Sequence, residues 1–227
     1  MFYNDYKNQA LADHKSALDK YKRIFKSFVK KCEQLYKTRV KACSTVEIIL
    51  DLINSIANKP KEFITNIEEV TIENHEFHET VEYQKNAEDS LKWSAFGTVA
   101  GVGVGTAIAT LSTSALAGPI GLGIGVVGAA GSLFGLSKQN KKIAEKAIKE
   151  TEQIKSYTQE IRIVKETVKT IRRKILLLNF KLRLACLFLG RLKNSDYVQL
   201  SEKNKIRLGT LVNNTLTLTH LINEKVD

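Results

Sequence analysis

The sequence has few of the residues that interrupt helices. Only two prolines, Pro60 and Pro119, occur among its 227 residues, and 11 of its 13 glycines lie within residues 93–137. Because proline and glycine are the least favourable residues in helix interiors, a chain nearly free of both outside one segment has a helical composition. With 43% hydrophobic residues, the chain can also bury a core. The composition therefore predicts an all-α protein.

Motifs of catalysis and cofactor binding are also missing. The sequence contains neither the HExxH motif of metalloproteases nor the GxxxxGK[ST] phosphate-binding loop. The stretch from Gly123 to Gly128 matches GxGxxG, but its surroundings are helical and no strand precedes it, which argues against a dinucleotide site. His75 and His78 lie among glutamates, and we expect a solvated acidic face there rather than a metal site. We therefore predict no catalytic residue, cofactor or metal.

Cysteine is scarce, and no secretory signal is recognisable. The three cysteines, Cys32, Cys43 and Cys186, are odd in number, lack CxxC spacing and lie at or near apolar helical positions. This pattern predicts buried, reduced thiols and a reducing compartment. The first residues contain no basic region followed by an apolar stretch. We expect synthesis in the cytoplasm, followed by membrane association or release by a route other than Sec export.

Charge is absent from one long segment. Residues 93–137 contain no Asp, Glu, Lys, Arg or His over 45 positions. A bilayer core is spanned by about 20 apolar helical residues, so this segment is too long for one span and suits two. Residues 117–121, which include Pro119, divide it into two arms at the place where a hairpin needs a turn. The segment therefore predicts a hydrophobic helical hairpin.

Small residues are regularly spaced along both arms of this hairpin. Glycine recurs every four residues in the first arm, and small residues alternate spacings of four and three in the second. Such stripes let helices pack closely in lipid, whereas in water each glycine costs a helix ~1 kcal/mol relative to alanine. The residues predicted to insert into a membrane are Trp93, Phe96, Gly97, Gly101, Gly105, Ile108, Leu111, Leu116, Pro119, Ile120, Gly121, Gly125, Gly128, Leu133, Phe134 and Gly135. A buried core hairpin in a soluble bundle is the alternative, because the mean hydropathy of −0.17 is that of a soluble protein.

Long apolar seams flank the hairpin on both sides. Within residues 18–56 and again within 154–192, apolar positions alternate spacings of three and four, with Arg39 as the one polar residue of the first seam. This heptad pattern is typical of long amphipathic helices. It predicts helices from about residue 3 to residue 57 and from about residue 138 to residue 193.

Two further helices complete the predicted bundle. A weaker amphipathic pattern follows Pro60, and a last helix follows a turn and cap at residues 194–196. We therefore predict an elongated bundle of four to five long amphipathic helices with a central glycine-rich hydrophobic helical hairpin. Residues 1–92 and 138–227 would form one discontinuous bundle domain, from which the hairpin of residues 93–137 is distinct.

The formal net charge of +11 is unevenly distributed. Residues 59–92 carry −5 and residues 138–193 carry +11. Basic residues next to a membrane segment meet anionic headgroups, which predicts an anionic lipid bilayer as the partner. The predicted headgroup-binding residues are Lys138, Lys141, Lys142, Lys146 and Lys149. A solvated basic face is the alternative, and nucleic-acid binding is disfavoured because no recognisable nucleic-acid-binding motif is present.

Long amphipathic helices interrupted by a glycine-rich apolar hairpin resemble the α-helical pore-forming toxins of the cytolysin A, haemolysin BL and XaxA/YaxA type. The resemblance covers the architecture of nearly the whole chain, and residues 93–137 are its specific stretch. It implies a soluble form that masks the hairpin, then inserts it and oligomerises with itself or with a partner subunit of similar architecture. Residues 116–123 also look like the membrane-inserting region of apolipoprotein L proteins, and colicin channel domains are a looser likeness.

These observations together predict a non-enzymatic membrane-inserting protein that forms a pore, alone or as one component of a multi-part toxin. Two alternatives remain at this point. One is a coiled-coil scaffold or interaction protein that a permanent hairpin anchors to a membrane. The other is a soluble helical interaction bundle.

Overall fold

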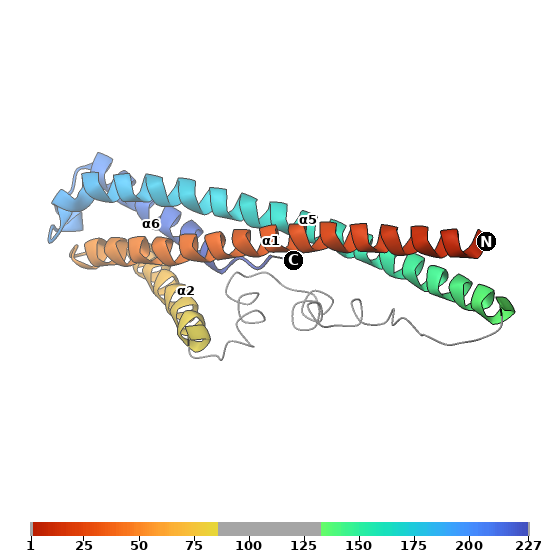
Figure 1. Ribbon diagram of the computed structural model, residues 1–227. Coiled ribbons are helices and arrows are strands. Elements are labelled where there is room, and N and C mark those ends of the chain that lie inside the picture. The colour runs from red at the N-terminus through yellow and green to blue at the C-terminus, as the bar shows by residue number, and fades with distance from the viewer. Residues whose placement is uncertain (1, 86–132, 227) are drawn as a thin grey trace. The chain divides into compact units, whose positions relative to one another are not determined.

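The computed structural model describes residues 2–85 and 133–226. Within these two ranges the chain forms four α-helices and two short 3-10 turns, and no strand. The elements are α1 (Phe2–Asn54), α2 (Lys61–Lys85), α5 (Leu133–Leu189), the 3-10 turns η1 (Gly190–Leu192) and η2 (Tyr197–Gln199), and α6 (Glu202–Asn223) (Figure 1). The predicted all-α class is confirmed.

Helix α5 begins earlier than the charge pattern predicts. The sequence places the start of this helix at about residue 138, whereas in the structure residues 133–137 are already helical. Residues 133–137 are the last five of the charge-free segment. The end of that segment and the lysine-rich residues after it therefore belong to one uninterrupted helix.

Contacts divide the chain into two compact units. Among the described residues, the first unit holds α1 up to Lys31 and α5 up to Glu166. The second holds the remainder of both helices, from Cys32 and from Thr167, together with α2 and α6. The predicted single domain of residues 1–92 and 138–227 stays a prediction.

In the first unit, α1 packs on α5 through small and apolar side chains. Ala10, Ala144 and Ala147 form a buried cluster, in which the small side chains allow the two helices to approach closely. The predicted seams continue from this cluster, and Tyr21 on α1 and Ile154 on α5 are buried.

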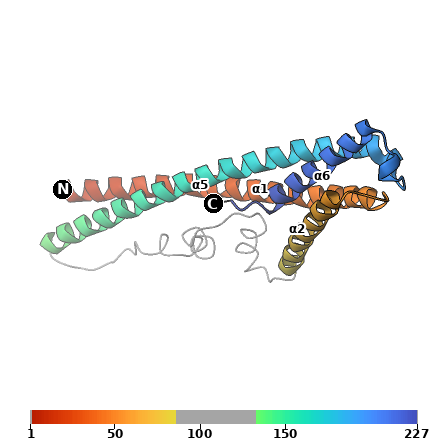
Figure 2. The same ribbon diagram turned by 180° about the vertical axis from the view of Figure 1, so that it is seen from behind.

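In the second unit, apolar side chains of all four helices are buried. Helices α2 and α6 pack against each other, and α6 lies beside the ends of α1 and α5 that belong to this unit (Figures 1 and 2). The buried side chains include Leu35, Val46, Ile49 and Ile53 of α1, Ile67, Val70 and Phe77 of α2, Ile171, Ile175, Leu182 and Leu189 of α5, and Leu208, Leu211, Leu218 and Ile222 of α6. This unit is therefore a helical bundle, and the residues of the two predicted seams contribute to its core.

Two connections in the second unit are hydrogen-bonded to each other: residues 55–60, which join α1 to α2, and residues 190–201, which join α5 to α6. The backbone N–H of Ala57 donates to the carbonyl of Ser195 at 2.9 Å, and that of Tyr197 donates to the carbonyl of Ala57 at 3.0 Å. Asn58 has a positive φ of 52° and donates its side-chain amide to Asp196 at 2.7 Å. The other carboxylate oxygen of Asp196 accepts the backbone N–H of Val198 at 2.9 Å. The predicted turn at residues 194–196 is confirmed, but Asp196 caps the 3-10 turn η2, and the N-cap of the last helix α6 is Ser201.

Candidate membrane interface

Most of the predicted membrane-inserting residues lie outside the described part of the chain. Of residues 93–137, only the backbone of 133–137 is described, so Leu133, Phe134 and Gly135 lie on α5. Those outside are Trp93, Phe96, Gly97, Gly101, Gly105, Ile108, Leu111, Leu116, Pro119, Ile120, Gly121, Gly125 and Gly128. The hairpin and the packing of its glycines therefore stay predictions.

The helices of residues 2–85 and 133–226 include none with a stretch both long and apolar enough to cross a bilayer.

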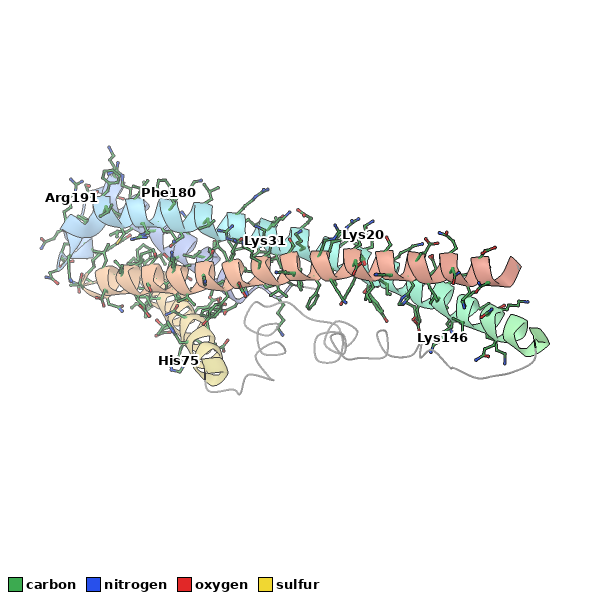
Figure 3. All side chains as sticks on the ribbon, in the orientation of Figure 1. Lys20, Lys31, His75, Lys146, Phe180 and Arg191 are labelled. Carbon is green, nitrogen blue, oxygen red and sulfur yellow. The ribbon has the colours of Figure 1, made fainter. Side chains whose placement is uncertain are left out.

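Three of the predicted headgroup lysines lie on one side of α5. Lys142, Lys146 and Lys149 are exposed, and their spacing of four and three residues aligns them along the helix (Lys146 is labelled in Figure 3). Ala144 and Ala147 are buried on the opposite side of α5. Within the described residues, neither Lys142 nor Lys149 forms an ion pair. These two charges are therefore available to an anionic partner.

The other two predicted lysines differ in their surroundings. Lys141 is exposed, and its Nζ lies 3.9 Å from a carboxylate oxygen of Glu145 one turn along the helix. An exposed pair at this distance contributes little to stability and leaves the lysine accessible. Lys138 lies on the first turns of α5, but its side chain is outside the described part.

A mostly buried ion pair lies beside Lys142, Lys146 and Lys149, which we call the lysine face of α5. His14 Nε2 of α1 lies 3.3 Å from Glu150 Oε2 of α5, and both side chains are largely buried. The other oxygen of Glu150 lies 3.9 Å from the Nζ of Lys146. The contact between His14 and Glu150 has the distance of an ion pair without the geometry of a hydrogen bond, and it is charged when His14 is protonated. It places a fixed carboxylate next to the lysines.

The polar residue of the α1 seam, Arg39, is fully buried in the second unit. Its side chain is only 1% exposed, and Nη2 donates to the backbone carbonyl of Glu224 at 2.6 Å. Burial lowers the pKa of Arg39 to about 10, and the nearby Glu224 partly opposes this shift. In the sequence, Arg39 stands out as the one polar residue of an apolar seam, but nothing there indicates that it binds the carbonyl of Glu224. Arg39 thus ties the C-terminal segment to α1.

We expect Arg39→Ala to lower the free energy of unfolding by about 3 kcal/mol, because the truncation leaves a cavity in the core. Arg39→Met keeps most of the apolar volume and removes the buried charge, so its free energy of unfolding should stay within about 1 kcal/mol of the wild type. Urea unfolding of the two variants measures both values. An equal loss in the two variants would show that the hydrogen bond to Glu224, and not the filled volume, is the stabilising feature.

The three cysteines are free, and two of them are buried. Burial raises the pKa of Cys32 and of Cys43 to about 12 in each case. Cys186 on α5 is half-buried, and its pKa is raised by the same cause. The prediction of buried thiols is therefore confirmed for two of the three.

We expect one thiol per native chain, that of Cys186, to react readily with a disulfide reagent at pH 8. At a pKa of about 12, the reactive thiolate of Cys32 or Cys43 is about a thousandfold less populated than that of an ordinary cysteine. Titration of thiols before and after denaturation measures the difference, and Cys186→Ser should remove the fast reaction. Fast reaction of all three native thiols would contradict the packing of the second unit.

The structure brings together three ionisable groups that sequence reasoning missed. His220 Nε2 of α6 lies 3.2 Å from Glu69 Oε1 and 3.0 Å from Glu73 Oε1, both on α2. Each residue offers one ligand atom within 4.8 Å of the others, as a divalent cation would need. A protonated His220 between the two carboxylates accounts for the same arrangement. Only the spacing of the two glutamates was visible in the sequence, because His220 is distant along the chain.

The histidines that the sequence singled out are arranged differently. His75 (labelled in Figure 3) and Glu76 are exposed on α2. His78 Nε2 lies 3.1 Å from Glu47 Oε1 of α1, and both side chains are about half exposed. The ion pair links α2 to α1.

Comparison with protein-family models, with curated proteins and with solved structures finds no match to this chain. The resemblance to α-helical pore-forming toxins therefore stays a prediction.

Proposed function

We propose that this chain is a membrane-inserting, pore-forming protein, or one component of a multi-part α-helical pore. The observation that carries the proposal is the continuity of α5. This helix includes residues 133–137, the end of the charge-free segment, and within its next turns presents the exposed lysines Lys142, Lys146 and Lys149. An apolar segment that enters a bilayer would place these lysines at the headgroups.

Electrostatics supports an anionic bilayer as the target. Each basic residue near an anionic membrane surface contributes about 1 kcal/mol of binding free energy. The lysine face of α5 offers three such residues on one side of a rigid helix, so all three can approach a flat surface together. In this proposal, the lysines orient the chain and residues 93–137 insert.

The spacing of small residues supports assembly after insertion. Gly97, Gly101 and Gly105 recur at every fourth position of the first predicted arm. In lipid, where apolar side chains gain nothing by leaving the solvent, small residues favour association because they let helix backbones approach. The arms would pack against each other or against those of further copies.

Dye release from liposomes tests the proposal. Purified full-length chain, free of detergent, is mixed with vesicles of phosphatidylcholine alone or with added phosphatidylserine, and release of an encapsulated dye is recorded. We expect release that is faster from the anionic vesicles. A chain that stays soluble and neither binds nor permeabilises any vesicle would instead be a soluble bundle. A chain that can be kept in solution only with detergent would have a permanent anchor.

A further inference from the structure

The second half of α5 is apolar on two opposite sides. One side carries the seam that includes Ile175 and Leu182, which is buried in the second unit. At about 100° per residue, a second set of apolar residues falls within an arc of about 120° on the other side. The members of this set, which we call the outer α5 face, are all exposed: Leu176, Leu177, Phe180, Leu184, Leu187 and Phe188.

The outer α5 face is strongly exposed. Leu187 is 78% exposed and Phe188 is 71% exposed, and Phe180 lies on the side of α5 that faces away from α1 (Figure 3). Single exposed apolar side chains are common, but a contiguous set on one helix marks an interaction site. Six large apolar side chains within four turns are such a set.

Basic residues border this face on every side. Arg173 and Arg191 lie at its two ends, and Lys181 and Arg183 lie along its two long edges by helical position. All four are exposed. Residues 167–193 contain eight lysines and arginines and no aspartate or glutamate. The occupant of this face must therefore be both apolar and negatively charged.

A hollow next to the face has the same chemistry. It measures about 430 Å³ and lies between α5 and α6. Leu182, Phe188 and Leu211 contribute apolar walls, and Lys181 and Arg207 supply positive charge. Phe188 belongs both to this hollow and to the outer α5 face. A site with apolar walls beside cationic groups suits an anionic amphiphile.

We propose that the outer α5 face is a docking surface for an anionic lipid bilayer. Phe180, Leu187 and Phe188 enter the boundary between headgroups and acyl chains, while the bordering arginines and lysines bind lipid phosphates and carboxylates. Exposed apolar residues flanked by basic ones are the pattern of helices that lie in a membrane surface. This docking goes beyond insertion, because it needs no contribution from residues 93–137.

Charge argues against other candidate occupants of the outer α5 face. A second copy that docked through the same face would bring its own eight basic residues of residues 167–193 against this one, and the like charges would repel. A second copy that docked through its acidic helix α2 would form a dimer, which sedimentation detects. The uncharged segment of residues 93–137 would cover apolar surface but would leave the basic border without partners. An acidic amphipathic helix of another protein is the remaining competitor, and the experiment below distinguishes it.

Vesicle flotation of the full chain tests the docking surface. The double variant Leu187→Ser/Phe188→Ser should bind phosphatidylserine-containing vesicles at least about tenfold more weakly than the wild type, since both side chains lose their apolar contact with lipid. Its melting temperature should be unchanged, because both positions are exposed. The matched control is Ile64→Ser/Ile72→Ser, which removes exposed apolar residues from the acidic helix α2 and should leave vesicle binding unchanged.

A second variant tests the charged border. Lys181→Gln/Arg183→Gln should weaken binding to the anionic vesicles at low salt, and the loss should be smaller at high salt because salt screens these charges. Binding to phosphatidylcholine alone should not change.

Three results would overturn the docking proposal. One is equal vesicle binding by the wild type and Leu187→Ser/Phe188→Ser. Another is a wild-type dimer in sedimentation that this variant converts to a monomer. The third is a wild type that binds an acidic amphipathic peptide, which the variant does not bind, but that floats with neither kind of vesicle. A wild type that binds anionic vesicles through this face without releasing dye would support docking and contradict pore formation.

Discussion

Replacing Gly101, Gly105, Gly125 and Gly128 by leucine is expected to abolish dye release from anionic liposomes. If the two arms pack closely in lipid, four branched side chains at these positions hold the backbones apart and prevent assembly. Glycine also destabilises helices in water, so the variant should keep the helical content of the wild type. Dye release and circular dichroism measure the two properties on the same preparation.

Alanine at the same four positions is the matched control. Its side chain is still small enough for close approach of helices, and it is the most favourable residue in a helix. The alanine variant should therefore release dye at a rate close to that of the wild type. If the leucine variant also releases dye at the wild-type rate, close packing of the arms has no part in permeabilisation.

Removing the charges of the lysine face of α5 is expected to weaken binding to anionic vesicles strongly. Lys142→Gln/Lys146→Gln/Lys149→Gln removes three charges, each of which contributes about 1 kcal/mol near an anionic surface. Binding to anionic vesicles should therefore weaken by about 3 kcal/mol, or about a hundredfold, at low salt. Flotation over a range of salt concentrations measures this loss, which should shrink as salt screens the charges.

A control variant with the same net charge as the α5 variant shows whether the position of the lysines matters or only the total charge of the chain. Lys22, Lys26 and Lys30 are exposed lysines of α1, and their change to glutamine removes the same three charges elsewhere. This control should bind anionic vesicles more tightly than the α5 variant. Equal losses would mean that vesicle binding follows the net charge of the chain and that the face on α5 has no particular role.

The buried seams could be predicted from the sequence because a helix buries residues at a fixed period. Leu35, Val46 and Ile49 of α1 and Ile161 and Ile175 of α5 are buried as that period requires. The turn at residues 194–196 was visible for a similar local reason, since Asn and Asp satisfy turn backbones with their own side chains. These features depend on neighbours close in the chain.

The start of α5 could not be placed from charge alone. The absence of charge over residues 93–137 marks a change of solvent or of burial, whereas a helix continues wherever its backbone hydrogen bonds continue. Leu133 therefore belongs to the same helix as Lys142, although the two differ in polarity.

The sequence by itself determined that this protein is helical, where its helices carry apolar seams, and that one segment lacks charge. Only the tertiary structure decided that Arg39 binds the carbonyl of Glu224 and that His220 lies beside Glu69 and Glu73. It also decided which apolar side of α5 is covered: Leu182 is buried and Leu187 is exposed. Helical periodicity places both side chains but does not say which neighbours arrive from distant parts of the chain, and those neighbours determine what is buried.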